Sequence, residues 1–341
     1  MVSLLVDGNW NLKRNYFKRR NLISKGENCG GVFGFLDSLR SVVTKLIPDR
    51  VVVCWDGFNA GKLRYEIYKP YKADRGKDWY LEKSMLGAGW NGTPEEKEKY
   101  DIFFQKNKLK NYLEELFIRQ AEVDFIEADD LIASYVLEST SVNEEIIIYS
   151  RDNDYLQLIS EKISILNPDN FNFLLTHKNF REKKGYILEN ELLLKCFETD
   201  SDNIKGVKGV TRKKLIKFFP DIANKKYLYK DLVDEAYEKQ KSNKLKIYES
   251  IINASDILYR NAQLMNLKKP FLNEEAKREV KIITHGILST DRDISNAVTM
   301  FMNDGYIQFL PSNEIDYFFS SFYRIMTKEK EYRDVVNNLN I

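Results

Sequence analysis

The stretch Phe125-Ile126-Glu127-Ala128-Asp129-Asp130-Leu131-Ile132 places three carboxylates between two apolar runs. The run before the acids predicts a strand over about residues 122–126, and the run after them predicts a helix over 128–139. Like charges this close repel one another and hold protons more tightly, so a fold that gathers them favours a bound cation. The alternative is that these acids only cap the following helix, where carboxylates are common and stabilising.

Three further acidic groups each follow a strand-like run. The runs cover about residues 2–6, 51–55 and 145–149, and the acids that follow them are Asp7, Asp56, Asp152 and Asp154. Helical patterns near 31–47 and 95–119 separate the runs, which is the alternation of a parallel sheet. Ligands bind at the carboxyl edge of such a sheet. We therefore predict an α/β fold with a mostly parallel central sheet flanked by helices, and an acidic site at one edge.

The kinds of side chain available as metal ligands restrict which cation could bind. The chain has only two histidines, and its three cysteines, Cys29, Cys54 and Cys196, are widely spaced, so it has no zinc-binding pattern. Ligation by oxygen alone favours Mg²⁺ or Mn²⁺. Three cysteines without a pairing pattern also indicate a reducing compartment.

Composition is typical of a globular enzyme. A chain of 341 residues with 43% hydrophobic content can fill a core, and its net charge of +2 says nothing about nucleic acid. The first apolar run breaks at Asp7, so we expect neither a signal peptide nor a membrane span there. The expected location is the cytoplasm.

The segment between the second and third predicted strands is too long for a simple crossover. Its first half, from Lys62 to Arg75, interleaves cations with aromatic residues, including Arg64, a mixture that suits phosphates and stacked bases. Residues 86–92 are rich in glycine. A solvated amphipathic helix with a loose loop is the alternative.

A second basic segment follows Asp202. Gly206 and Gly209 lie at a predicted turn between helices, and Lys213 and Lys214 begin the next helix. Exposed backbone N–H groups and cations at such a turn bind phosphate without reading sequence. Residues from about 187 onward are predicted to be helical, with helices near 189–197, 212–219, 230–240 and 244–264, and two more amphipathic segments after about 291.

These motifs occur in one order over about residues 2–265. They are Leu5-Val6-Asp7-Gly8, Trp55-Asp56, Tyr71-Lys72-Ala73-Asp74-Arg75, Glu127-Ala128-Asp129-Asp130, Ser150-Arg151-Asp152-Asn153-Asp154 and Ser201-Asp202-Asn203-Ile204-Lys205-Gly206-Val207. In this order the chain resembles the 5′-nucleases, which include phage flap endonucleases, phage RNase H and the 5′-exonuclease domain of bacterial DNA polymerase I. The phage members resemble it most, partly because Thr93-Pro94-Glu95-Glu96-Lys97 and the flanking helix fit a compact arch.

The resemblance implies a domain division and a set of site residues. The nuclease core would cover 1–186 with an arch at about 58–119, a DNA-binding region with a helix-three-turn-helix would cover 187–270, and a helical extension would cover 271–341. A first metal site would comprise Asp7, Asp56, Glu127 and Asp129, and a second Asp152, Asp154 and Asp202, with Asp129 and Asp130 near the midline. The catalytic candidates are Asp129, Asp152, Lys72 and Arg75. The nucleic-acid contacts would be Arg64, Tyr71, Lys72, Arg75, Gly206, Gly209, Lys213 and Lys214.

The activity implied is 5′-3′ exonuclease and flap endonuclease cleavage by a two-metal mechanism, which would remove RNA primers and flaps during replication. The implied partners are branched or nicked duplex DNA and RNA–DNA hybrid, and a single-stranded DNA-binding protein is a further candidate partner. The chain would act as a monomer and would not bind a membrane. The turn at Gly206 would also hold K⁺. Two alternatives are a PIN-like ribonuclease and a DNA-junction binder without catalysis.

Three positions depart from the family pattern. Thr199 stands where a further aspartate is usual, with Asp200 one residue off, and Thr211 replaces the third glycine of the turn. Residues beyond about 270 have only a loose counterpart, and we expect the aromatic run over 317–323 to pack in the core.

Overall fold

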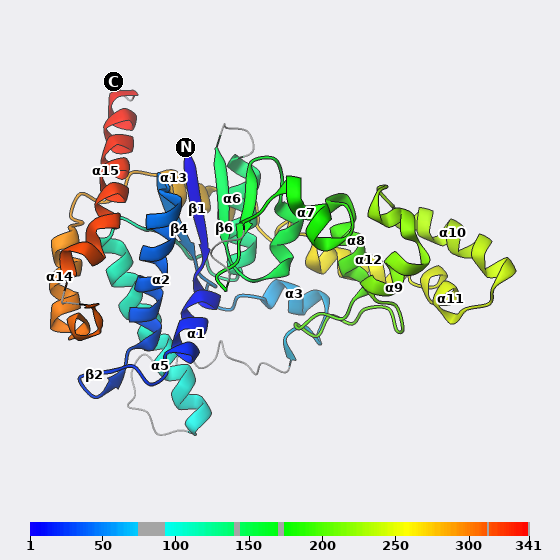
Figure 1. Cartoon of the computed structure of the whole chain (residues 1–341), viewed down its shortest axis with the longest axis horizontal. Helices are drawn as coiled ribbons and strands as arrows, with labels where there is room; N and C mark the ends of the chain where they lie inside the picture. The colour runs from blue at the N-terminus through cyan, green and yellow to red at the C-terminus, as the bar shows by residue number, and fades with distance from the viewer. Residues whose placement is uncertain (74–92, 140–143, 170–173, 312–313, 340–341) are drawn as a thin grey trace.

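The computed structural model describes residues 1–73, 93–139, 144–169, 174–311 and 314–339 (Figure 1). The predicted cation Arg75 and the glycine-rich residues 86–92 lie outside these ranges. Among the described residues, no helix is long and apolar enough to cross a membrane.

A sheet of six strands forms the centre of the described structure, in the order β5-β4-β1-β6-β7-β8. Its strands are β1 (Val2–Asp7), β4 (Arg50–Cys54), β5 (Arg119–Ala121), β6 (Glu145–Tyr149), β7 (Ile163–Leu166) and β8 (Leu174–Leu175). All neighbours pair in parallel except β7 and β8, which are antiparallel. The predicted mostly parallel sheet is confirmed.

The order of the strands creates a switch point beside β1. The chain passes from β1 to its neighbour β4 and outward to β5, and then returns to β6 on the other side of β1. Asp7 pairs with Cys54 of β4, and Val6 pairs with Tyr149 of β6, so the three strands end level with one another. The carboxyl ends of strands at such a switch point form a ligand-binding crevice in open α/β sheets.

Helices cover both faces of the sheet, as a parallel sheet requires. Alternate residues of β1 point to opposite faces, so that Leu5 joins one core and Leu4 and Val6 join the other. The Leu4 side is covered by α1 (Gly8–Lys18), α2 (Gly30–Leu46), α5 (Pro94–Glu115), α14 (Ile294–Asn303) and α15 (Ile315–Leu339). The Leu5 side is covered by α6 (Ala128–Ser139) and α13 (Glu274–His285).

The core on the Leu5 side continues away from the sheet into a group of short helices, which Figure 1 shows on the right. They are α7 (His177–Lys184), α8 (Glu191–Phe197), α9 (Arg212–Phe218), α10 (Tyr229–Ser242), α11 (Lys246–Ile252) and α12 (Ser255–Met265). The single helix predicted over 244–264 is wrong, because it divides into α11 and α12. The Tyr229 hydroxyl donates to the carbonyls of Ile251 and Ile252 at 2.8 and 3.1 Å, and so satisfies the carbonyls exposed at the end of α11.

The predicted strand over 122–126 is also wrong. Phe125 has a left-handed φ of 66°, which a strand does not contain, and the strand lies earlier, at Arg119–Ala121. Arg119 is held there by Glu329 of α15, with its Nε and Nη2 atoms 2.8 and 2.5 Å from the carboxylate oxygens. A polar strand is therefore completed by a partner that is 210 residues away in sequence.

The C-terminal segment is part of the core on the Leu4 side. Phe318, Phe319 and Phe322 of α15 are buried, and the rings of Phe301 and Phe318 lie 4.9 Å apart. The prediction that this aromatic run packs inside is confirmed for these three residues, while Tyr317 and Tyr323 are exposed.

Candidate metal centre

Asp7 occupies the carboxyl end of β1, where it also caps α1. Its Oδ1 accepts from the Trp10 backbone N–H at 3.1 Å, and its Oδ2 accepts from the hydroxyls of Ser150 and Tyr155 at 3.2 and 3.3 Å. Burial, reinforced by the charges of Asp56 and Asp152, raises the pKa of Asp7 to about 7. The acids that follow β1, β4 and β6 are therefore close enough to repel one another.

Asp56 connects the end of β4 to the start of α6. Its Oδ1 accepts from the Ala128 backbone N–H at 2.9 Å, and its Oδ2 accepts from the Asn9 side-chain amide at 2.5 Å. The contact at the first turn of α6 follows from the unpaired N–H groups that every helix start presents. It brings the acids that flank Ala128 in sequence to the same edge of the sheet.

Glu127, Asp129 and Asp130 surround the N-terminus of α6. One oxygen from each lies within 4.8 Å of the others, and this is the one acidic group within the described residues whose spacing suits a metal. Burial raises the pKa of Asp129 well above its usual range, and Asp130 and Glu127 add to the rise against the effect of Arg64. For Glu127 the cations prevail over burial, and Lys72 and Arg64 lower its pKa to about 2.

The second predicted group lies on the loops beyond β6 and α8. Asp152 begins the 3₁₀ segment Asn153–Leu158, and its Oδ1 accepts from the Asp154 backbone N–H at 2.8 Å. Asp202 accepts from the Tyr71 hydroxyl at 3.3 Å. Asp154 and Asp202 line one small pocket together with Asp129, so members of both predicted metal sites share a space.

Tyr155 shows that the acids converge. Its side chain is buried, and burial together with the charges of Asp7, Asp129 and Asp152 raises its pKa well above the usual value. Sequence reasoning did not identify this residue. One tyrosine thus lies within the electrostatic reach of acids from β1, α6 and the loop after β6.

Lys195 of α8 is another residue that the sequence analysis missed. Its ammonium contacts Asp154 and lies 3.1 Å from Asp200, so it joins the loop after β6 to the loop before Asp202. A lysine inside the apolar run Leu192-Leu193-Leu194-Lys195-Cys196-Phe197 was the available signal. Asp200 is thereby engaged by a lysine.

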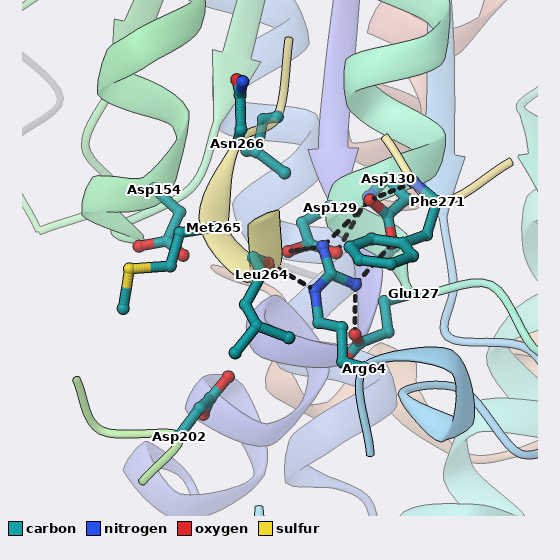
Figure 2. A network of polar contacts seen from close by, with 12 residues as sticks. Arg64, Glu127, Asp129, Asp130, Asp154, Asp202, Leu264, Met265, Asn266 and Phe271 are labelled. Atoms are coloured by element: carbon teal, nitrogen blue, oxygen red, sulfur yellow. Dashed lines mark hydrogen bonds and ion pairs between the residues drawn. The ribbon is translucent and has the colours of Figure 1, made fainter. Parts of the chain in front are cut away.

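The cations predicted to meet nucleic acid divide into two kinds. Lys72 is partly exposed, and its ammonium contacts Glu127 and lies 3.7 Å from Asp202. Arg64 is 4% exposed and surrounded by carboxylates (Figure 2), so the prediction that it binds nucleic acid is corrected. The same correction applies to Tyr71, which is 5% exposed and donates to Glu127 at 2.9 Å.

Asp130 differs from Asp129 in having both oxygens within hydrogen-bond distance of Arg64. Arg64 donates to them at 2.6 and 3.0 Å, and the Phe271 backbone N–H donates at 3.0 Å. These contacts hold Arg64 in place, and the role of Asp130 as a metal ligand stays a prediction.

The predicted glycine turn lies between α8 and α9. Gly206 is packed so closely that a Cβ atom there would lie 2.3 Å from the Phe197 carbonyl oxygen, and its N–H donates to Thr199 Oγ1 at 3.1 Å. That amide is therefore taken, which corrects its expected availability to phosphate. Gly209 has a left-handed φ of 81° and open space around it. Lys213 and Lys214 are exposed.

The two departures near this turn have structural roles. Thr199 accepts from Gly206, and Thr211 caps α9 by accepting from the Lys214 backbone N–H at 3.4 Å. Arg212, the first residue of α9, faces inward to Glu191 and Glu198, 3.1 Å from each.

Comparison with known proteins gives relatives for this arrangement. Residues 2–185 match the family described as 5′-3′ exonuclease, N-terminal resolvase-like domain. A 5′-3′ exonuclease of Buchnera aphidicola subsp. Schizaphis graminum is 29% identical over 273 residues, which are 78% of this chain and 81% of that protein. The thermostable DNA polymerase I of Thermus thermophilus is 33% identical over 226 residues, which are 65% of this chain and only 24% of the polymerase.

Solved structures show the same fold. The flap endonuclease of bacteriophage T5, in a complex with DNA and metal ions, has a TM-score of 0.59 and 18% identity over 89% of this chain and 100% of that chain.

Proposed function

The chain belongs to the 5′-3′ exonuclease family, and we propose that it is a structure-specific nuclease that hydrolyses phosphodiester bonds at the 5′ ends of branched or nicked duplex DNA and RNA–DNA hybrid. The observation that carries this proposal is the convergence of acids from β1, β4, α6 and the loop after β6 around Tyr155 and Asp7. The relative from Buchnera is named a 5′-3′ exonuclease, and the T5 protein was solved with DNA. The role proposed in replication is the removal of RNA primers and 5′ flaps.

Two divalent cations, Mg²⁺ or Mn²⁺, fit these residues. The donors are carboxylate oxygens, which these ions prefer. Asp7 and Asp129 have raised pKa values, so a cation would replace the protons that burial otherwise favours. The residues proposed to hold one ion are Asp7, Asp56, Glu127 and Asp129, and those proposed for the other are Asp152, Asp154 and Asp202. Bound ions in such a site would activate the attacking water and stabilise the leaving oxygen.

The protein's own groups fix the carboxylates before substrate arrives. The hydroxyls of Ser150 and Tyr155 and the Trp10 N–H hold both oxygens of Asp7. Asn9 and the start of α6 hold Asp56 in the same way. Fixed ligands of this kind avoid reorganisation during the reaction.

Lys72 is proposed to act on the scissile phosphate. Its ammonium already lies at the acids, between Glu127 and Asp202, and its side chain is 28% exposed at the site. Those charges outweigh burial and raise its pKa well above the usual value, so it stays cationic at any working pH. A cation in this position can neutralise charge that develops on the phosphate. Arg75 is proposed to assist it and lies outside the described residues.

The duplex is proposed to bind at the turn before α9. Lys213 and Lys214 are exposed beside it, and phosphates are bound by such cations without base readout. The Gly209 carbonyl accepts from the Lys214 ammonium at 2.7 Å, which supports the proposal that K⁺ can bind carbonyls of this turn. Action as a monomer, and a single-stranded DNA-binding protein as partner, stay predictions from the resemblance.

The test is cleavage of a 5′-labelled flap in Mg²⁺ with mapping of the products. Asp152→Asn should lower the cleavage rate by roughly three or more orders of magnitude while leaving flap binding in Ca²⁺ intact, because the loss falls on the transition state. Asp316→Asn is the matched control, since Asp316 is an exposed acid at the start of α15. Near-normal cleavage by Asp152→Asn would contradict the metal assignment. Preference for plain single-stranded RNA over the flap would instead favour a PIN-like ribonuclease.

A further inference from the structure

Arg64 is a buried arginine at the centre of the acidic group (Figure 2). It lies on the short helix α3 (Lys62–Ile67), and its Nη1 atom contacts Glu127 and lies 2.6 Å from Asp130 Oδ2. Its Nη2 atom lies 3.0 Å from Asp130 Oδ1 and 3.7 Å from Asp129 Oδ2. The guanidinium therefore forms a two-pronged contact with Asp130 and reaches both other acids of the group.

The remaining sides of the guanidinium are enclosed by the chain that follows α12. Its Nε atom donates to the Leu264 carbonyl at 2.9 Å, and the Phe271 ring covers it with its centroid 4.7 Å away. The Phe271 N–H donates to Asp130 at 3.0 Å. The Arg64 side chain is only 5% exposed in this enclosure, so its charge acts mainly on the acids around it.

The contacts of Arg64 give two adjacent aspartates different environments. Asp130 is 1% exposed, with both oxygens facing Arg64. Asp129 keeps a side chain that is 26% exposed and lines the pocket shared with Asp154 and Asp202. One acid is thus neutralised internally, and the other remains available to the pocket.

We propose that Arg64 is a positioning residue that serves as a fixed cation of the metal centre, neutralising Asp130 and orienting Glu127 so that the acids accept no further ion. The inference rests on the proposed metal-dependent function. The guanidinium reaches all three carboxylates of the group and adds a positive charge among them, beside that of Lys72 at Glu127. Without Arg64 the same oxygens, all within 4.8 Å, would form an additional site for a divalent cation.

Arg64→Gln tests this inference without any cleavage measurement. Removal of one partner from a buried ion pair leaves uncompensated charge, so the metal-free variant should lose roughly 5 to 10 °C in Tm. Ca²⁺ should then raise the Tm of Arg64→Gln by roughly 5 °C more than it raises that of the wild type, because the ion takes the place of the guanidinium. Titration calorimetry with Mn²⁺ should count one more ion in the variant.

Arg119→Gln is the matched control. Arg119 is also a buried arginine with a two-pronged carboxylate contact, to Glu329, but within the described residues Glu329 belongs to no cluster of acids spaced for a metal. The Arg119→Gln variant should have a lower Tm than the wild type. Ca²⁺ should raise its Tm no more than that of the wild type, and calorimetry should count no additional Mn²⁺. Arg64→Lys keeps the charge and loses the fork, so it should keep the wild-type ion count with part of the Tm loss.

The outcomes separate the possibilities. Folding of Arg64→Gln only in Ca²⁺ would support the inference, whereas failure to fold in both buffers would overturn it, since a cation should substitute for the side chain. An unchanged ion count with a wild-type response to Ca²⁺, or an additional ion in Arg64→Lys, would also overturn it. A protein that passes these tests and cleaves no flap would contradict the proposed function alone, and one that cleaves flaps and fails them would contradict only this inference.

Discussion

Replacement of Asp7 by asparagine should stabilise the metal-free protein, and more strongly at pH 8 than at pH 5. Burial and the neighbouring Asp56 and Asp152 raise the pKa of Asp7 from its usual 3.8 to about 7. Between these values the folded protein binds more protons than the unfolded chain, so stability falls as pH rises through this window and levels off above about pH 7. The asparagine variant has no such proton to lose.

The size of the effect follows from the pKa difference. At about 1.4 kcal/mol for each pKa unit, the ionised Asp7 destabilises the metal-free fold by roughly 4 kcal/mol at pH 8 and by less than about 2 kcal/mol at pH 5. Asparagine can still accept from Trp10, and its amide can donate to the hydroxyl oxygens of Ser150 and Tyr155, which in the wild type donate to Asp7. The hydrogen bonds therefore need not be lost.

The assay is urea unfolding in EDTA at both pH values. The difference in unfolding free energy between Asp7→Asn and wild type should be larger at pH 8 than at pH 5 by roughly 2 to 3 kcal/mol. In Mg²⁺ at pH 8 the difference should shrink or change sign, since the ion stabilises the protein that retains the carboxylate. A difference of equal size at both pH values would refute the reasoning, and Asp316→Asn should show no such pH dependence.

Two further predictions concern the cations Lys72, Lys213 and Lys214. Lys72→Ala should lower single-turnover cleavage of a flap much more than it weakens duplex binding, because this ammonium lies at the acids; equal losses would make it an ordinary phosphate contact. The double change Lys213→Ala with Lys214→Ala should weaken flap binding, reduce the slope of log affinity against log salt by about two units, and leave cleavage at saturation near wild type. An unchanged slope would remove these lysines from the duplex contact.

The strands were predictable from sequence where both faces of the sheet bury apolar residues. Continuous apolar runs such as Ile146-Ile147-Ile148-Tyr149 predict buried strands, and β1, β4 and β6 lie within a residue or two of their predicted positions. β5 was missed because its residues are polar and are completed by distant partners. Gln120 accepts from the Trp55 indole at 3.2 Å, and Arg119 is held by Glu329. No local pattern reports a partner so far along the chain.

Acids were easier to place than cations because the strand that precedes an acid fixes its location. Asp7, Asp56 and Asp152 follow strands whose ends meet, so the topology alone predicts that they converge. A lysine or arginine carries no such constraint, since its long side chain can reach either solvent or a buried carboxylate. Local composition therefore gave Arg64 and Lys72 the same expected role.

Depth in the fold separates these two cations. α3 is followed within a few residues by Tyr71 and Lys72, yet Arg64 points into the enclosure made by Leu264 and Phe271, whereas Lys72 remains at the edge of the acids. The residues that close the enclosure come about 200 positions later in the chain, after α12. An arginine buried in this way balances charge within the protein, because its Nε and both Nη atoms already donate to the Leu264 carbonyl, Glu127 and Asp130. A lysine that is 28% exposed can leave its carboxylates when a phosphate arrives, so exposure at the site, more than charge, distinguishes a residue that holds the metal centre from one that can meet the substrate.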